Sequence, residues 1–413
     1  MQKKNLNLVI FILGLLTAIG PFSIDMYLPA FPAIAKDFST TVAHVSLSLS
    51  SFFIGISLGQ LLYGPLLDKY GRKKPLYYGF ILYILASLGC AIASTGNMLI
   101  GLRLFQALGG CVGMVAARAM VRDLFPVEEN AKIFSMLMLV VGVSPIIAPT
   151  VGGYLTATLG WHSIFIVLTV MGTCILCLIH FYLPESKKGD KELSLLPKNI
   201  IKNFFEVSKI PQFYTYTLTG SIGAAGLYAY IAGSPFVFME IFKVNEKHYG
   251  WIFAFNAAGL ITTSQINSFI VKKYSLKKII TVALSFQAAT AIIFFAAAIL
   301  QLLNVYTTIA LIFLFLCCQG FIFPNTSALA MAPFTKNAGS ASAVMGAVQM
   351  AIGSIMSALV SVLQNNTAIP MTGVMALCAS GALLMLLGGI KKIEHKETEL
   401  MIEEECIEMI ETL

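Results

Sequence analysis

The sequence has few charged residues: Asp, Glu, Lys and Arg make up only 11% of its 413 residues, whereas hydrophobic residues make up 57%. A soluble globular domain has about 25% charged and about 45–50% apolar residues. The mean hydropathy of the chain is +0.83. This balance excludes a single soluble core and predicts a membrane protein with many spanning segments.

Several chemical signatures are missing as well. The eight cysteines show no metal-ligand or disulfide-framework spacing, and the pair Cys174 and Cys177 lies in an apolar run where a redox pair is not expected. No phosphate-binding G-x-x-x-x-G-K-[ST] motif is present, which argues against an ATP-driven pump. No nucleophile–base pattern indicates an enzyme. The net charge of +7 comes from short clusters between apolar runs, which argues against nucleic-acid binding.

What the sequence has is a series of apolar segments. A membrane-spanning helix needs about 20 mostly apolar residues, and backbone groups in lipid must be satisfied within the segment. Barrel strands would alternate every second residue, which these segments do not. We therefore predict an all-α membrane protein with twelve transmembrane helices. The predicted helices are 7–35, 44–67, 75–95, 97–124, 131–158, 161–183, 211–240, 247–271, 277–301, 304–331, 339–364 and 368–390.

A polar stretch separates the first six helices from the last six. We predict an N-terminal six-helix bundle at residues 1–184, a cytoplasmic linker at 185–210, a C-terminal six-helix bundle at 211–391 and an acidic cytoplasmic tail at 392–413. The spacing of apolar residues in the tail also allows a short amphipathic helix. The two halves are expected to be parallel repeats, with the substrate site near the membrane midplane between them.

Basic residues predict the orientation. Lysines and arginines gather in the loops on one side, such as 69–74 and 185–210, whereas the opposite loops hold only Lys36, Lys243 and Lys247. Basic loops stay in the cytoplasm. With an even number of helices, both termini are expected in the cytoplasm.

One acidic residue, Asp25, lies inside the first apolar segment. A charged side chain at membrane depth costs roughly 2.5–3.5 kcal/mol on insertion scales, so such residues usually have a function. We predict that Asp25 takes up and releases a proton. Arg103 lies in helix 97–124, about two turns from its predicted outer end, and is expected at a depth similar to that of Asp25. A structural ion pair is one possible role for Arg103, beside the role that the family resemblance described below implies.

The loop after the second helix reads Gly64-Pro-Leu-Leu-Asp68-Lys-Tyr-Gly71-Arg72-Lys-Lys-Pro-Leu. Its glycines permit a tight turn, and Asp68 can pair with neighbouring basic residues. The segment resembles the G-x-L-x-D-x-x-G-R-K-x-x-L signature of the major facilitator superfamily. The resemblance implies the major facilitator fold, and it implies that Gly64, Asp68, Gly71 and Arg72 stabilise an outward-open state.

Two further segments resemble motifs of that family. Arg103 and Gln106 match an R-x-x-Q-G pattern, with Leu108 inserted before the glycines, and the resemblance ties Arg103 to proton coupling. Pro149, Gly152 and Gly153 match the G-x-x-x-G-P-x-x-G-G motif of proton-coupled antiporters, although Ser144 and Ala148 replace its first two glycines. Small residues also allow close packing without any coupling role, which is the alternative interpretation.

Residues 6–390 as a whole resemble the drug exporters of the Bcr/CflA type. The resemblance rests on the segments 24–30, 120–126, 160–165, 234–240 and 338–343. It implies drug:proton antiport across a bacterial inner membrane, without an enzymatic activity or a cofactor and with the proton gradient as the energy source. Its expected partners are a small-molecule substrate, protons and the lipid bilayer, with the chain acting as a monomer.

The expected function is therefore proton-coupled efflux of small hydrophobic or amphipathic compounds by alternating access. A dedicated exporter of a metabolite, such as an amino acid or siderophore, is the alternative, and a uniporter or symporter is a further one. Glu240, at the outer end of its helix, is expected to be an interfacial residue, and a second proton site is the alternative. Polar and aromatic residues at helical positions can line the substrate cavity or simply pack between helices; these candidates are Tyr27, Gln106, Tyr228, Tyr230, Phe236, Asn256 and Gln349.

Overall fold

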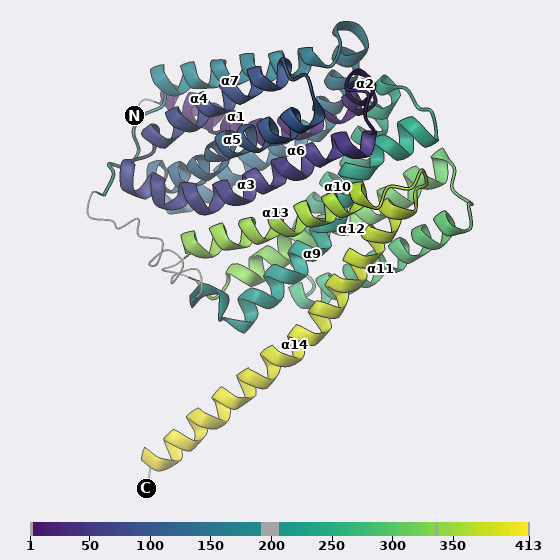
Figure 1. Cartoon of the computed structure of the whole chain (residues 1–413). Coiled ribbons are helices and arrows are strands. Elements are labelled where there is room, and N and C mark those ends of the chain that lie inside the picture. The colour runs from purple at the N-terminus through teal and green to yellow at the C-terminus, as the bar shows by residue number, and fades with distance from the viewer. Residues whose placement is uncertain (1–2, 191–205, 335–337, 412–413) are drawn as a thin grey trace.

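The computed structural model describes residues 3–190, 206–334 and 338–411, and these residues are almost entirely helical. A helix lies in each of the twelve predicted segments (Figure 1). The N-terminal helices are α1 (Lys3–Asp25), η1 (Leu28–Ala30), α2 (Phe31–Asp37), α3 (Val42–Tyr70), α4 (Lys73–Ala91), α5 (Gly96–Leu124), α6 (Val127–Leu159) and α7 (His162–Phe181). The C-terminal helices are α9 (Pro211–Pro235), η2 (Phe236–Ile241), α10 (Glu246–Ile270), α11 (Leu276–Ile299), α12 (Val305–Met331), α13 (Ala338–Val362) and α14 (Ile369–Glu411).

Polar side chains begin several of these helices. The first backbone N–H groups of a helix have no partner within it, and a preceding Ser, Thr or Asn oxygen can accept a hydrogen bond from one of them. Thr41 caps α3, Thr95 caps α5 and Asn245 caps α10 in this way. Asn304 and Thr307 form a reciprocal capping box at the start of α12. These short polar sequences explain why the apolar segments are separated where they are.

Two predicted helices are interrupted. The segment 7–35 breaks after Asp25 into the short η1 and α2, and the segment 211–240 changes from α9 to the π-helical η2 after Pro235. Proline lacks a backbone N–H and clashes with the preceding turn, so Pro29 and Pro235 favour these breaks. The consequence for the site is that Asp25 lies at the end of a helix.

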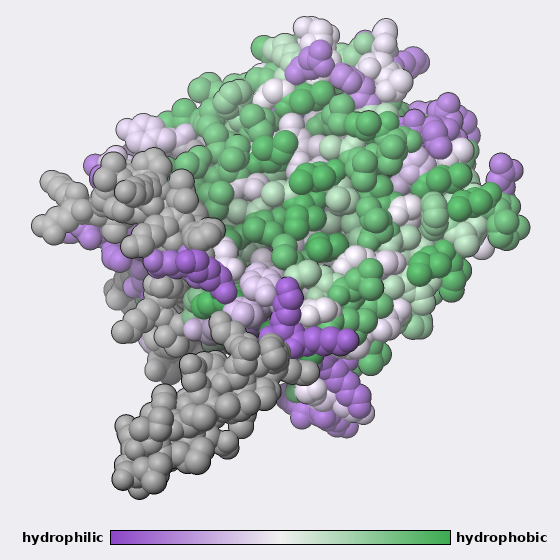
Figure 2. Space-filling model, turned by 60° about the horizontal axis from the view of Figure 1, so that its bottom comes forward, coloured by the Kyte–Doolittle hydropathy of each residue, from purple (hydrophilic) through white to green (hydrophobic). Residues whose placement is uncertain are grey.

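Eleven segments among the described residues are long and apolar enough to cross a membrane. The twelfth predicted span, α10, has 25 residues but carries polar residues such as Asn256 and Asn267 along its length. It packs against α6 and α12, and both Asn256 and Asn267 are buried. Figure 2 shows an apolar surface band with hydrophilic side chains at its two ends, as a membrane-spanning protein requires.

The helices pack as two groups, which we call the N-terminal bundle (α1–α7) and the C-terminal bundle (α9–α14). In the first, α5 packs against α3 and α4, and α1 packs against α6. In the second, α9 packs against α12, α13 and α14. The bundles meet through the pairs α3–α13 and α6–α10, and α3 and α13 run side by side in Figure 1.

The bundles have two ends. We call the end with the loop 69–74 the basic side, and the opposite end, with η1 and α2, the far side. The tail after Lys392 continues α14 as a helix to Glu411, which extends away from the bundles (Figure 1). The first residues of the predicted linker pack on the basic side, where the Asp190 backbone N–H donates to the Asp68 carbonyl oxygen at 3.0 Å. Residues 191–205 of that linker lie outside the described part of the chain.

Candidate proton and substrate site

Asp25 is the last residue of α1, at the break that leads into η1. Its side chain is buried, with only 5% of the residue exposed. The carboxylate is close enough to Tyr230 on α9 and Tyr249 on α10 to interact electrostatically with both hydroxyl groups. Among the described residues, no lysine, arginine or histidine nitrogen lies within 4.0 Å of it. Asp25 of the N-terminal bundle therefore lies within electrostatic range of two tyrosines of the C-terminal bundle, next to η1, which contacts α9 and α10.

The two tyrosines are themselves held by hydrogen bonds. The Asn256 amide donates to the Tyr230 hydroxyl at 3.3 Å, and the Tyr249 and Ser234 hydroxyls share a hydrogen bond of 2.8 Å. The ring of Phe253 packs against both tyrosines, with centroids 5.6 and 6.2 Å away. Tyr230 and Asn256 were predicted as site residues and lie together, whereas Tyr249 and Ser234 were not predicted. The spacing of Tyr249, Phe253 and Asn256, on one face of a helix, could have pointed to Tyr249.

Arg103 is completely buried inside the N-terminal bundle. Its guanidinium lies over the rings of Phe52, Tyr27 and Phe165, at 4.1, 4.6 and 5.9 Å from their centroids. One guanidinium nitrogen, Nη1, donates to the Gln106 side-chain oxygen at 2.6 Å. Among the described residues, no carboxylate lies within 4.0 Å of Arg103. In this conformation Arg103 therefore forms no ion pair within the described part of the chain, and its role stays a prediction.

The predicted residues Tyr27 and Gln106 belong to the polar network around Arg103. The Gln106 amide also donates to the Ser87 hydroxyl at 2.8 Å, and the Tyr27 hydroxyl shares a hydrogen bond of 2.8 Å with Ser48. Tyr27 follows Asp25 by two residues and lies under Arg103. Asp25 and Arg103 are thus linked through Tyr27 and do not pair with each other.

The remaining predicted substrate residues lie elsewhere. Tyr228 on α9 packs against Phe53 of α3, with ring centroids 4.7 Å apart, where the two bundles meet. Phe236 begins η2, and Gln349 lies partly exposed on α13. Neither forms a side-chain hydrogen bond with the Asp25 or Arg103 clusters in the described structure, so their roles stay predictions. Glu240 lies 3.7 Å from Lys243 near the far side and is partly exposed, as expected of an interfacial residue.

The basic-side loop forms a compact ion-pair cluster. Arg72 donates to Asp68 at 2.8 Å and to Asp123 on α5 at 2.8 Å, and its backbone N–H donates to Glu185 at 2.6 Å. Burial opposes the charged form of Arg72, but these two side-chain hydrogen bonds outweigh it and raise its pKa. Gly71 has φ of +83°, a conformation that favours glycine. Asp123 and Glu185 were not predicted as members of this cluster.

The α6 motif packs against backbone on two sides. A Cβ on Gly152 would collide with the carbonyl oxygen of Met26, next to Asp25. A Cβ on Gly153 would lie 2.5 Å from the carbonyl oxygen of Glu246 on α10, and one on Gly250 would lie 2.9 Å from that of Pro149. These glycines therefore allow α6 to touch both η1 and the opposite bundle on the far side.

The bundles also meet along α3 and α13, through serine hydroxyls that were not predicted. We call this contact and the α6–α10 contact the two seams between the bundles. Ser46 on α3 hydrogen-bonds to Ser361 on α13, and Ser50 shares a hydrogen bond of 2.9 Å with Ser357. Ser57 donates to the Ala347 carbonyl oxygen at 2.9 Å, closer to the basic side. The far side is therefore closed along both α3–α13 and α6–α10. The helical spacing of serines in both α3 and α13 was the signal in the sequence that could have indicated this contact.

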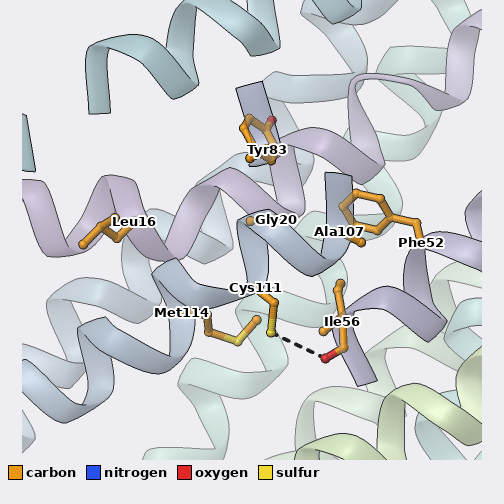
Figure 3. A pocket seen from close by; sticks show the side chains of 9 residues that line it. Leu16, Gly20, Phe52, Ile56, Tyr83, Ala107, Cys111 and Met114 are labelled. Atoms are coloured by element: carbon orange, nitrogen blue, oxygen red, sulfur yellow. Dashed lines mark hydrogen bonds between the residues drawn. The ribbon is translucent and has the colours of Figure 1, made fainter. Parts of the chain in front are cut away.

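Figure 3 shows a small cavity inside the N-terminal bundle. Phe52 lies both in this cavity wall and under the Arg103 guanidinium. The other lining residues come from α1, α3, α4 and α5; they are Leu16, Gly20, Ile56, Tyr83, Ala107, Gly110, Cys111 and Met114. In Figure 3 the Cys111 thiol donates to the Ile56 carbonyl oxygen, which joins α5 to α3 across the cavity.

Comparison with known proteins identifies the family. Residues 13–359 match the Major Facilitator Superfamily. The uncharacterized MFS-type transporter YdgK of Bacillus subtilis is 35% identical over 384 residues, which cover 91% of this chain and 94% of YdgK. The bicyclomycin resistance protein homolog of Haemophilus influenzae is 32% identical over 91% of this chain and 94% of its own. The multidrug resistance protein MdtL of Escherichia coli is 27% identical over 90% of this chain and 93% of MdtL.

The fold agrees with this assignment. A solved structure of a bacterial homolog to the human lysosomal transporter Spinster matches with a TM-score of 0.71 and 13% sequence identity, covering 94% of this chain and 96% of that one. These relatives confirm the predicted fold class, the predicted family resemblance and the prediction of a secondary transporter. The chain belongs to the major facilitator superfamily and is a secondary transporter of that family.

Proposed function

We propose that this transporter exports small hydrophobic or amphipathic compounds, including antibiotics, in exchange for protons. The observation that supports this most directly is Asp25, a buried carboxylate that faces the opposite bundle without a basic partner among the described residues. Such a group can gain a proton without breaking an ion pair. The names of the Haemophilus and Escherichia relatives, which refer to bicyclomycin and multidrug resistance, support the drug class.

The proposed cycle uses the two seams between the bundles. With both termini in the cytoplasm, the far side is the outer side, and this conformation is closed to the outside. Compound and proton compete for the path between the bundles. Proton uptake by Asp25 from the outside accompanies release of the compound, and proton loss toward the cytoplasm permits reloading. Arg103 keeps its charge throughout and sets the electrostatic potential of the path.

A dedicated metabolite exporter and a uniporter or symporter remain the competing functions. The glycine contacts of α6 with α10 support an antiporter, because they lie at the closed far-side seam where the antiporter motif was predicted. A metabolite exporter on the same fold would differ only in its substrates. We also propose that the protein lies in the inner membrane, acts as a monomer and uses no cofactor.

The test is uptake into everted membrane vesicles with an imposed pH gradient, using a phenicol and a cationic dye. We expect gradient-driven uptake by the wild type and none by Asp25→Asn. Glu240→Gln is the matched control, since Glu240 is a partly exposed carboxylate next to Lys243, and it should retain uptake. Undiminished uptake by an Asp25→Asn variant that is still inserted in the membrane would refute the role of Asp25 as the proton carrier. Uphill transport that persists without a proton gradient would refute proton coupling.

A further inference from the structure

The Tyr230 hydroxyl has two polar neighbours, one from each bundle. The side-chain amide of Asn256 on α10 donates a hydrogen bond of 3.3 Å to it, and the Asp25 carboxylate lies within electrostatic range. The ring of Phe253 is stacked on the Tyr230 ring, with an interplanar angle of 16°. Both Tyr230 and Asn256 are buried. The hydroxyl is therefore held in place by the C-terminal bundle, close to a carboxylate of the N-terminal bundle.

The direction of the hydrogen bond decides what the Tyr230 hydroxyl can do. An amide N–H group can only donate, so the Tyr230 oxygen is the acceptor in its bond with Asn256. The phenolic proton takes no part in that bond and stays available to a second acceptor. Among the described residues, Asp25 is the carboxylate whose charge interacts with this hydroxyl. The proton is therefore free to point toward Asp25.

The Asn256 amide is held in the orientation that this arrangement requires. Its carboxamide oxygen is buried and has no hydrogen-bond partner among the described residues. Turned over, the amide would present this oxygen to Tyr230, and the phenolic proton would then be donated to Asn256 and not directed to Asp25. Buried polar atoms without a partner are rare in folded proteins, so each one needs an explanation. Here the explanation is that the amide nitrogen is reserved for Tyr230.

Two nearby hydrogen-bonded pairs lack this directionality. Tyr249 and Ser234 share a bond in which either hydroxyl can be the donor, so the bond does not fix where the Tyr249 proton points. Asn267, the other asparagine of α10, forms reciprocal hydrogen bonds with Asn325 at 3.1 and 2.8 Å, so both ends of its amide have a partner. Asn256 therefore differs from Asn267 both in its partner and in its unused oxygen.

We propose that Asn256 is a positioning residue, which directs the Tyr230 hydroxyl proton at Asp25 and so favours the charged carboxylate while the far side is closed. This inference rests on the proposed function, in which Asp25 loses its proton toward the cytoplasm in this conformation. A donor directed at a carboxylate stabilises its charged form. Because Tyr230 and Asn256 belong to one bundle and Asp25 to the other, separation of the bundles on the far side removes this influence and favours proton uptake there.

The other titratable and charged groups around Asp25 leave this role to Tyr230. Tyr249 on α10 is the second hydroxyl within electrostatic range, and the direction of its bond is open. Neither α9 nor residues 133–153 of α6 contain a charged side chain. In the far-side half of the neighbouring elements, the remaining charged or titratable groups lie near the surface or in the Arg103 cluster; they are Lys36, Asp37, His162, Glu246, Lys247 and Arg103.

The first test titrates Asp25 itself. A protonated carboxyl group has an infrared carbonyl band that a carboxylate lacks, and subtracting the spectrum of a matched Asp25→Asn protein isolates the band of Asp25. Spectra are recorded over a range of pH on the full-length protein in lipid nanodiscs. In Tyr230→Phe, which loses only the hydroxyl, we expect the band to persist to a pH about one unit higher than in the wild type. An unchanged or lower midpoint in folded Tyr230→Phe would overturn the inference.

The second test asks whether Asn256 acts through Tyr230. Asn256→Leu removes the amide at similar size and should shift the midpoint in the same direction by about half a pH unit. Added to Tyr230→Phe, it should cause no further shift, because the hydroxyl on which it acts is already gone. Additive shifts, or no shift in folded Asn256→Leu, would overturn the inference. If Asn256→Leu fails to fold, Asn256→Ala takes its place with the same expectation.

The matched control is the other buried asparagine pair. Asn267→Leu combined with Asn325→Leu replaces both partners, so neither amide is left buried without the other. We expect the Asp25 midpoint to be unchanged in this variant. A shift as large as that in Asn256→Leu would show that any loss of polarity on α10 moves the midpoint, and it would overturn the positioning role.

The two proposals fail in different ways. Unchanged titrations in Tyr230→Phe and Asn256→Leu, together with gradient-driven uptake that Asp25→Asn abolishes, would refute the positioning role and leave proton-coupled export standing. Shifted titrations as expected, together with uptake that ignores the proton gradient, would support the positioning role and refute the proton coupling.

Discussion

Gly153 on α6 offers a direct way to shift the transporter between conformations. Its position lies against the backbone of Glu246 and Lys247 on the opposite bundle, and an added Cβ would come within 2.5 Å of the Glu246 carbonyl oxygen. Ordinary carbon–oxygen contacts need more space, so α6 and α10 must separate in Gly153→Ala. Overpacking of this kind costs roughly 1–3 kcal/mol. Since this clash exists only while the far side is closed, the cost falls on that conformation alone.

The expected result is a change of populations. A cost of about 1–3 kcal/mol corresponds to roughly a 5- to 150-fold increase in the ratio of far-side-open to far-side-closed molecules. Double electron–electron resonance can measure this ratio with spin labels on the exposed far-side positions Ser94 and Leu302, in a background without the native cysteines. We expect a longer distance component to grow in Gly153→Ala.

Three other glycines provide the controls. Gly250→Ala should shift the distances in the same direction from the other helix, because its Cβ would lie 2.9 Å from the Pro149 carbonyl oxygen. Gly142→Ala lies on the same seam but would only reach Ile261 at an ordinary 3.8 Å, so it should have little effect. Gly152→Ala should destabilise the N-terminal bundle itself. Unchanged distances in both Gly153→Ala and Gly250→Ala would refute the assignment of this seam as the far-side closure.

Two further predictions concern the basic-side loop, and thermal unfolding of the purified protein checks both. Asp123→Asn should destabilise the protein by roughly 1–3 kcal/mol, because the Asp123 side chain is mostly shielded and accepts a hydrogen bond from buried Arg72. Asp68→Asn should cost less than about 1 kcal/mol, because the Asp68 side chain is half exposed. An equal loss of stability in the two variants would contradict this order. Gly71→Ala should cost about 1–3 kcal/mol because of its backbone conformation. Gly64→Ala should be neutral or stabilising by up to about 1 kcal/mol, since its Cβ would meet no atom within 4 Å, and a large loss there would indicate a role that this conformation does not display.

The helices could be predicted from the sequence because the membrane imposes a simple rule on composition. Each apolar run of sufficient length became a helix, and short polar runs such as the one at Thr95 became caps. The breaks at Pro29 and Pro235 were not predicted, because a hydropathy pattern records apolar character and not the loss of single hydrogen bonds. Residues 247–271 were predicted as one of these apolar runs, although the helix found there, α10, is more polar than the eleven segments that are apolar enough to cross a membrane.

The partners of the site residues were harder to predict. Asp25 and Arg103 could be recognised individually because charged residues inside apolar segments are rare. Which groups surround them depends on the rotation of each helix and on which bundle faces which, and no local pattern contains that information. For this reason the partners of Tyr249 and of the α3 and α13 serines were missed, although the helical spacing of these residues marks the helix faces on which they lie. The same reason led to an ion pair being considered for Arg103, where the structure has aromatic rings instead.

The contacts around Asp25 connect its environment with the closure of the far side. Met26, the next residue, lies against Gly152 of α6, and the adjacent Gly153 lies against Glu246 of α10. Since α10 is held at its start by α6, Tyr249 is held near the Asp25 carboxylate by the same contact.

Separation of α6 from α10 would therefore carry Tyr249 away from Asp25 while it opens the far side. The carboxylate would then lose the electrostatic influence of the Tyr249 hydroxyl and gain access to water, so that it could be protonated from that side. Tyr249→Phe separates these two events, because it removes the hydroxyl and leaves the Gly153 seam intact. We expect normal distances between spin labels at Ser94 and Leu302 in Tyr249→Phe, together with a changed pH dependence of transport. Altered distances with an unchanged pH dependence would show that Tyr249 acts through packing alone.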